Sequence, residues 1–235
     1  MKILVIDVGG THVKILATGQ EVVRKIDSGF KMTAHKMVKE VKEQSADWEY
    51  DVISLGYPSF AFRGHPVCEP ANIGSGWVGF DFEGAFGRPV RLINDAALQA
   101  LGSYEGGRML FLGLGTGLGT ALVIDGVLEP LDLAHLTYED GKSFEDYAGL
   151  KGMEKLGKKT WRTYVDKITD QLMSALGAEY VVIGGGNARL LKELPQGARL
   201  GNNEHAFIGG YRLWEACEWS STGQIIIADK CWKKE

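Results

Sequence analysis

The chain contains two copies of one short pattern: an apolar strand, a cluster of glycine and threonine, and a second apolar strand. The first copy spans residues 2–17 around Gly9-Gly10-Thr11, and the second spans residues 109–124 around a cluster at 113–120. Gly-rich connections between β-rich runs predict hairpins. Because one hairpin opens each half of the chain and predicted helices follow it, the pattern favours two α/β domains that flank a cleft.

The glycines of these clusters are the unusual part of an ordinary composition. There are 32 glycines in 235 residues, close to twice the usual share of ~7%. The 45% hydrophobic and 24% charged residues are typical of a globular protein and exclude wholesale disorder. Apolar runs are far shorter than the ~20 residues of a membrane span, and Asp7 interrupts the first, so no signal peptide is expected. A net charge of −4 with dispersed Lys and Arg indicates neither nucleic-acid nor membrane partners.

The cysteines give an indication of the compartment. Cys68, Cys217 and Cys231 are odd in number and far apart. This favours a reducing environment, so we expect a cytoplasmic protein without a disulfide framework or a Cys-rich zinc site.

Periodicity predicts the remaining elements. Apolar residues at helical spacing predict helices at 34–41, 96–104, 160–176 and 206–217, with a short one at 188–191. β-rich runs predict further strands at 51–56, 90–93 and 180–183. Residues 59–87 are rich in Gly, Pro and aromatic side chains, which predicts a long ordered loop that carries binding residues. We expect the domains to divide near residues 102–107, giving units 1–104 and 105–235.

Both Gly/Thr clusters suit a phosphate group. Consecutive glycines let backbone N–H groups approach an anion with no Cβ in the way. Neither cluster is a Walker A loop or a dinucleotide fingerprint, and each alone could be only a tight turn. Two such hairpins that face each other could clamp a phosphate chain from both sides. The predicted phosphate-binding residues are Gly9, Gly10, Thr11, Lys14, Gly115, Thr116 and Gly117.

Two more features belong to the same predicted cleft. Asp7 ends the first strand, where a carboxylate can hold Mg²⁺ through water. A third cluster, Gly184-Gly185-Gly186-Asn187, follows a strand and precedes the predicted helix 188–191. A helix N-terminus there would favour anions, and bare glycines would leave room for a ring or ribose. These four residues are the predicted nucleotide-binding set, with a plain strand-to-helix turn as the alternative.

Asn94-Asp95 lies at another predicted strand end. A carboxylate facing the cleft could take the proton of a hydroxyl whose oxygen attacks phosphorus, so Asp95 is the candidate catalytic base. The same position also fits a helix N-cap, for which Asp is favoured.

The order of these motifs resembles the sugar-kinase/actin/heat-shock-70 superfamily, and within it the ROK family of sugar kinases and its polyphosphate/ATP glucokinases. The resemblance covers nearly the whole chain. The matching segments are 7–14 (phosphate-1), 56–58, 76–82 and 87–90 (sugar loops), 94–96 (Asn-Asp-Ala), 112–122 (phosphate-2), 183–187 (adenosine) and 206–210 (final helix).

The resemblance implies two actin-like, ribonuclease H-like domains and phosphoryl transfer from polyphosphate or ATP to the 6-hydroxyl of glucose. It implies Asp95 as the base, Mg²⁺ on the donor near Asp7, and a homodimer. It also implies that Asn94, Asp132, His135 and Glu145 are hydrogen-bonding partners of sugar hydroxyls.

The chain departs from the family pattern in three places. Asp132 and Ala134 replace a family Glu and Gly, which leaves the sugar's identity open. No cysteine lies between His135 and Cys217, so the family's zinc cluster is not expected, as in the polyphosphate glucokinases. The tail 219–235 extends beyond the usual family end, and an added edge strand or a subunit contact could account for it.

Two alternatives stay open. One is a kinase for another hexose or an N-acetylhexosamine. The other is a non-catalytic sugar-binding protein, since some members of the family are repressors with an N-terminal helix-turn-helix. The predicted first strand begins at Lys2, which leaves no place for such a module, and the presence of Asp95 argues against a dead enzyme.

Overall fold

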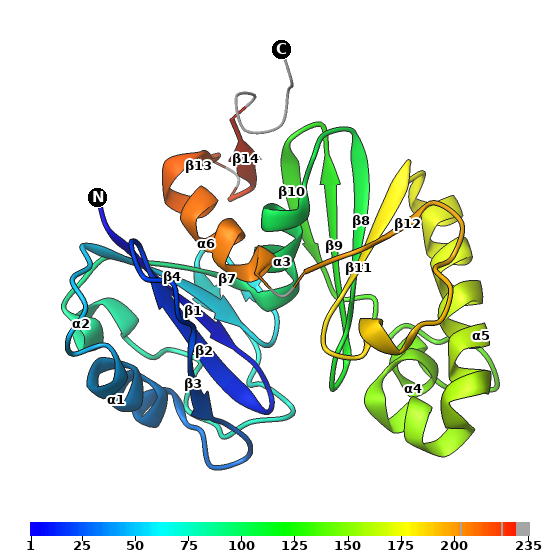
Figure 1. Ribbon diagram of the computed structural model, residues 1–235, viewed down its shortest axis with the longest axis horizontal. Helices are drawn as coiled ribbons and strands as arrows, with labels where there is room; N and C mark the ends of the chain where they lie inside the picture. Colours follow the sequence, from blue (N-terminus) through cyan, green and yellow to red (C-terminus); the bar gives the residue numbers. More distant parts are fainter. Residues whose placement is uncertain (203, 222, 229–235) are drawn as a thin grey trace.

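The computed structural model describes residues 1–202, 204–221 and 223–228. Two β-sheets lie on either side of a central pair of helices, α3 and α6, while α1 and α2 lie on one outer side and α4 and α5 on the other (Figure 1). The helices are α1 (Ala34–Gln44), α2 (Phe82–Phe86), α3 (Asp95–Ser103), α4 (Phe144–Ala148), α5 (Leu150–Leu176) and α6 (His205–Glu215). The predicted two-lobed α/β fold is confirmed.

The first sheet has the order β3-β2-β1-β4-β7. Strands β1 and β2 form the predicted hairpin, and β3 extends it to an antiparallel meander. On the other side, β4 pairs with β1 and β7 pairs with β4, both in parallel. Every residue of β1 and β4 is buried, as expected for central strands covered on both faces. The strands are β1 (Ile3–Val8), β2 (His12–Ala17), β3 (Arg24–Asp27), β4 (Val52–Tyr57) and β7 (Val90–Asn94).

The second sheet has the order β12-β11-β8-β9-β10-β14-β13. The tail supplies two of its strands: β14 pairs antiparallel with β10, and β13 pairs with β14. The described part of the tail is therefore an added edge hairpin, and residues 229–235 lie outside the described residues. The strands are β8 (Arg108–Leu114), β9 (Leu118–Ile124), β10 (Val127–Leu131), β11 (Tyr180–Gly184), β12 (Ala198–Leu200), β13 (Cys217–Trp219) and β14 (Ile225–Ile227).

Helices α3 and α6 cross where both carry a glycine. A Cβ on Gly102 would overlap the carbonyl oxygen of His205, and a Cβ on Gly209 would overlap that of Leu98. The two backbones therefore touch directly. Helix α6 is also bonded to the first sheet, because the Ser54 hydroxyl donates to the Gly210 carbonyl at 2.6 Å. One continuous apolar core thus joins both sheets through these two helices.

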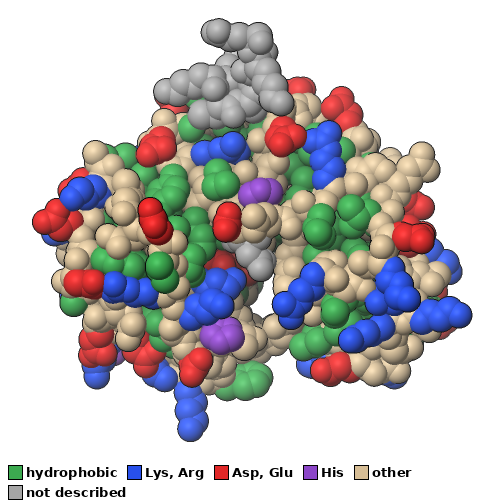
Figure 2. Space-filling view, viewed as in Figure 1, with side chains coloured by type: hydrophobic (Ala, Val, Ile, Leu, Met, Phe, Trp, Pro, Cys, Tyr) green, Lys and Arg blue, Asp and Glu red, His purple; other side chains and the backbone are tan. Residues whose placement is uncertain are grey.

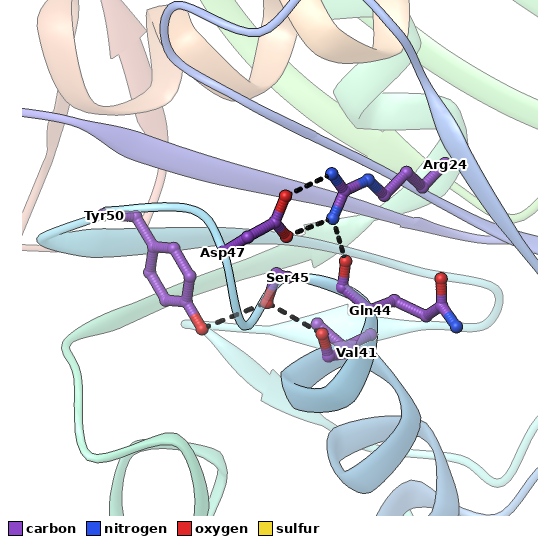
Figure 3. Close-up of polar contacts among 6 residues, drawn as sticks. All are labelled: Arg24, Val41, Gln44, Ser45, Asp47 and Tyr50. Carbon is purple, nitrogen blue, oxygen red and sulfur yellow. Dashed lines mark hydrogen bonds and ion pairs between the residues drawn. The ribbon is translucent and has the colours of Figure 1, made fainter.

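Side-chain contacts bind the end of α1 to the first sheet (Figure 3). The Ser45 hydroxyl donates to the Val41 carbonyl at 2.7 Å and lies 3.3 Å from the Tyr50 hydroxyl. Arg24 on β3 donates to the Gln44 carbonyl and to both carboxylate oxygens of Asp47. This hydrogen bonding lowers the pKa of Asp47 to about 2. The helix therefore ends in a fixed position against the outer strand.

The structure corrects three local expectations. Residues 188–191 form a single 3₁₀ turn, Ala188–Leu190, and not a helix. Residues 59–87 contain a small hairpin, β5 (Ala61–Phe62) and β6 (His65–Pro66), and the short helix α2. Helix α4 and the first turns of α5 were not predicted, because Gly149, Gly152 and Gly157 obscure their periodicity. In the described part of the chain, no helix is long and apolar enough to span a membrane.

Candidate active site

A cavity of about 740 Å³ lies between the lobe built on the first sheet and the lobe built on the second sheet. The space-filling view shows the molecule hollowed there (Figure 2). Segments from all over the chain line it, including both Gly/Thr hairpins. The predicted site residues in its lining are Asp7, Gly9, Gly10, Thr11, Lys14, Asn94, Asp95, Gly115, Thr116, Gly117, Asp132, His135, Glu145, Gly185, Gly186 and Asn187. Gly184 is the predicted residue that does not line it.

The two Gly/Thr hairpins meet at the floor of this cavity. A Cβ on Gly10 would lie 3.2 Å from the Thr116 hydroxyl oxygen, so glycine permits this close approach. Each turn is closed by its own backbone: the Gly9 N–H donates to the His12 carbonyl at 3.0 Å, and the Gly115 N–H to the Gly117 carbonyl at 3.1 Å. The hairpins therefore present two backbone loops to one space, as a phosphate clamp requires.

Asp7 is a buried charged group at the site. Its residue exposure is 6%, and its Oδ2 lies 3.2 Å from the Lys14 Nζ. The pairing follows from the hairpin register, which places Asp7 directly opposite Lys14. The ion pair offsets part of the cost of burying the carboxylate.

Asp95 begins α3 at the edge of the cavity, but it is not the cap of that helix. The N-cap is Asn94, whose Oδ1 accepts the Ala96 and Ala97 N–H groups at 2.9 and 3.1 Å. The pKa of Asp95 is raised to about 7, first by burial and then by the charge of Asp7. Its Oδ1 accepts the Ala96 N–H at 2.8 Å, which lowers the pKa in part. Asp95 therefore has the properties of a proton acceptor poised near neutral pH.

The amide of Asn94 is engaged at both ends. Its Oδ1 caps α3, and its Nδ2 donates to the Ser59 carbonyl at 3.0 Å. The residue lines the cavity, yet its clearest role in the structure is to fix α3 to the loop after β4. Its predicted contact with a sugar hydroxyl stays a prediction.

The other predicted sugar contacts come from the segment between β10 and α4. Asp132 and His135 are exposed and line the cavity. Glu145 on α4 supports the second hairpin, because its Oε2 accepts the Leu118 N–H at 3.1 Å. The Glu145 N–H also donates to the Ala134 carbonyl at 3.0 Å. Glu145 thus connects the 132–135 segment to the phosphate-2 loop.

The triple glycine is partly structural. Gly185 has φ +82° and packs against the Leu114 backbone, which a Cβ would overlap. Asn187 donates through Nδ2 to the Gly115 carbonyl at 2.9 Å, so its side chain secures the phosphate-2 loop. Gly184 lies behind the cavity, against the Phe111 ring. Gly186 alone faces open space. Because the predicted helix is a three-residue 3₁₀ turn, it supplies no helix N-terminus for an anion.

Sequence reasoning missed part of the lining. Residues 58–60 and 68–73 line the cavity, as do Gln99 and Arg189. The Gly/Pro-rich composition of 59–87 indicated a binding loop but not which part faces the cleft. The segments 76–82 and 87–90, which resemble sugar loops, do not line it. Trp77 is instead fully buried, with its ring centroid 5.6 Å from that of Tyr57.

The residues available for a metal are few. Across residues 1–202, 204–221 and 223–228, no group of three His, Cys, Asp or Glu side chains is placed to hold an ion. Mg²⁺ keeps much of its hydration and is often bound by one or two carboxylates together with substrate phosphates. Asp7, with Asp95 nearby, fits that kind of site.

Comparison with known proteins supports the resemblance to sugar kinases that the motifs indicated. No protein-family model matches the chain. The chain is 26% identical over 208 residues to a polyphosphate glucokinase of Mycobacterium tuberculosis (strain CDC 1551 / Oshkosh), which covers 78% of this chain and 77% of that protein. It is 27% identical over 152 residues to the polyphosphate glucokinase of Mycobacterium leprae (strain TN), covering 58% of this chain and 46% of that protein. The chain therefore spans less than half of the length of this second relative.

Solved structures show the same fold. The inorganic polyphosphate/ATP-glucomannokinase of Arthrobacter sp. strain KM superposes with a TM-score of 0.78 at 22% identity, over 88% of this chain and 96% of that one. A ROK family glucokinase of Streptomyces griseus, in complex with glucose and AMPPNP, has a TM-score of 0.69 at 14% identity, over 89% and 97% of the two chains. The chain thus has the actin-like fold of the ROK sugar kinases and is similar in sequence to polyphosphate glucokinases, as its motifs predicted.

Proposed function

We propose that this protein is a sugar kinase that transfers a phosphoryl group from polyphosphate or ATP to the 6-hydroxyl of glucose. One observation carries the proposal: a single cavity is lined by Asp95, by both Gly/Thr hairpins and by the 132–145 segment. The residues proposed as proton acceptor, phosphate clamp and sugar-binding side chains thus line one cavity. The names of the similar proteins supply the sugar and the donors.

Asp95 is proposed as the base. The sugar hydroxyl oxygen attacks the terminal phosphorus of the donor, its proton passes to the Asp95 carboxylate, and the bond from phosphorus to the bridging oxygen breaks. The electron pair of that bond leaves with ADP or with a polyphosphate shortened by one unit. The raised pKa of Asp95 makes its carboxylate a stronger base than an exposed one. The surrounding residues need only position the two substrates and exclude water.

The donor is proposed to lie across the two hairpins, with its phosphate oxygens on the N–H groups of Gly10, Thr116 and Gly117, because those of Gly9 and Gly115 close the turns themselves. Lys14 would turn from Asp7 toward the phosphate chain. Mg²⁺ would be held by Asp7, in part through water, and would supply neutralisation of the donor's charge. The nucleoside of ATP would lie beside Gly186.

The sugar is proposed to lie between Asp95 and the segment that carries Asp132, His135 and Glu145. A carboxylate and an imidazole can pair with neighbouring hydroxyls and penalise a sugar that lacks one. Because Asp132 is shorter than the family's Glu, another hexose or an N-acetylhexosamine remains the second candidate.

The proposal is tested by steady-state assays on glucose, mannose and N-acetylglucosamine, each with ATP and with polyphosphate. Production of glucose 6-phosphate with at least one donor supports it. Binding of a sugar without turnover under any donor would contradict it and favour a non-catalytic sugar-binding protein. Omitting Mg²⁺ in a parallel reaction tests the metal, and a light-scattering mass in solution tests the expected homodimer.

A further inference from the structure

A second cavity, of about 450 Å³, adjoins the candidate active site. Phe60, Asn94 and Pro130 line both cavities, so the two spaces are direct neighbours. Asn94 directly precedes the proposed base in the chain. A molecule held at Asp95 therefore has a neighbouring space large enough for a further group, within the ~300–1,000 Å³ range of small-molecule sites.

The added tail hairpin builds the far side of this second cavity. Trp219 on β13, Gly223 and Gln224 line this cavity together with the β5–β6 hairpin, and Gly64 approaches the Trp219 ring. The walls therefore come from both lobes. The sequence suggested an added edge strand or a subunit contact for this tail, and the edge hairpin that it forms also builds a wall of this cavity.

The chemistry of the walls points to a neutral ring that carries hydroxyl groups. Phe60, Phe62 and Trp219 supply aromatic surface, and Phe62 is 52% exposed. Glu129 supplies a carboxylate, already fixed by a hydrogen bond from the Gln224 amide. A sugar ring has apolar faces for aromatic side chains and hydroxyl donors for a carboxylate. Glu129 and Arg63 both line the cavity. A wholly apolar group would cover these charged side chains without bonding to them, whereas a neutral ring with hydroxyl groups can hydrogen-bond to both.

We propose that the second cavity binds the second ring of a disaccharide whose first ring occupies the active site. This inference rests on the proposed function for its first ring and extends the substrate class from monosaccharides to glycosides. The transfer step at Asp95 is unchanged, because only the group attached to the acceptor ring differs.

The test is titration calorimetry of the full chain with cellobiose, maltose and glucose, without donor. The parent protein should bind one of the disaccharides. Glu129→Gln keeps the shape and removes the charge, and losing a hydrogen bond to a charged group costs about 1.5–3 kcal/mol, so the Kd of the disaccharide should rise about ten- to a hundredfold. Phe62→Ser and Trp219→Ala should weaken the same complex. In all three variants the Kd of glucose should stay within about twofold.

Leu200→Ala is the matched control, because Leu200 is an exposed apolar residue on β12, at the opposite edge of the second sheet. It should leave both affinities unchanged. Thermal melts show whether Trp219→Ala still folds, and Glu129→Gln carries the test if it does not. No binding of either disaccharide by the parent would overturn the inference, as would equal weakening of glucose and disaccharide in Glu129→Gln.

The assay also separates this inference from the proposed function. If glucose is phosphorylated and no disaccharide binds, the second cavity is not a sugar subsite and the proposed function stands. If a disaccharide binds through Glu129 and no sugar is phosphorylated, the subsite stands and the kinase proposal fails.

Discussion

Lys14 and Asp7 are cross-strand partners in the first hairpin, and the Lys14 Nζ lies 3.2 Å from the Asp7 Oδ2. Both charges also act on Asp95: Asp7 raises its pKa and Lys14 lowers it. The phosphate-1 hairpin therefore does more than present glycines to a donor. It also contributes to the electrostatic environment of the proposed base, which follows β7 of the same sheet.

The first prediction concerns this pair. Lys14→Met removes the cation that lowers the pKa of Asp95, so the acidic limb of kcat/KM for the sugar should move to higher pH. Asp7→Asn removes the anion that raises it, so the limb should move to lower pH. The measurement is a pH profile at saturating donor. Lys25→Met is the control, since exposed Lys25 pairs with Lys14 across the same sheet. If both substitutions moved the acidic limb in the same direction, this would argue against the electrostatic coupling of the pair to Asp95.

The second prediction concerns the base itself. Asp95→Asn should keep the hydrogen bond from the Ala96 N–H and lose the proton acceptor. General-base removal costs typically ~10²–10⁴-fold in kcat, while the affinity for the sugar should change little. Turnover and calorimetric Kd together check this. Activity within a fewfold of the parent would leave Asp95 with no catalytic role.

The third prediction concerns stability against pH. The pKa of Asp95 rises from 3.8 to about 7 on folding, so between these values the folded chain holds a proton that the unfolded chain has released. The free energy of unfolding contributed by this group therefore falls as pH rises through that window. Asp95→Asn should raise Tm at pH 8 and leave it close to the parent near pH 4. Equal Tm values at pH 8 would mean that the carboxylate ionises at no cost.

The fourth prediction separates the two donors. Gly186 faces open space beside the cavity, so Gly186→Val should hinder a nucleoside and reduce kcat/KM for ATP more than for polyphosphate. Gly185→Ala is a matched contrast, because its strained φ and its overlap with Leu114 disturb the phosphate-2 strand. In that variant kcat/KM should fall for both donors to a similar extent. If Gly186→Val reduced kcat/KM for ATP and for polyphosphate equally, the nucleoside would not lie beside Gly186.

The fifth prediction concerns the shortened acid. Asp132 is exposed at the cavity and is proposed to accept a sugar hydroxyl. Asp132→Ala removes a charged hydrogen-bond acceptor worth about 1.5–3 kcal/mol, so the KM for glucose should rise about ten- to a hundredfold. Steady-state kinetics on glucose and mannose check it, with exposed Asp125→Ala on the β9–β10 turn as control. An unchanged KM for both sugars would remove this segment from the sugar site.

Much of this arrangement could be predicted from short patterns. The two Gly/Thr clusters located both hairpins, and the strand ends located Asp7 and Asp95, because these depend on neighbours in the chain. What could not be predicted depends on contacts between distant segments. The Asn187 amide bonds to Gly115, and the Gly185 backbone packs on Leu114, so a cluster that resembles a nucleotide site also supports the phosphate-2 loop.

The loop region at residues 59–87 was also only partly predictable from local sequence. Residues 68–73 line the cavity, whereas Trp77 is buried, and the sequence of 59–87 is too irregular to assign one side to solvent. The sequence suggested an added edge strand for the tail but not its partner, because β14 pairs with β10, about a hundred residues earlier in the chain. Pairing over such a separation leaves no local periodic signal.

The contact of Gly102 with α6 and of Gly209 with α3 has a mechanical consequence. Because no side chain separates the two backbones, α3 and α6 have little freedom to slide past each other at this point. Any relative movement of the two sheets would therefore have to turn about this crossing, with displacements that grow with distance from it. The glycine hairpins and the tail hairpin extend from the two sheets on either side of this crossing, so a turn of one sheet relative to the other about the crossing would change the width of both cavities.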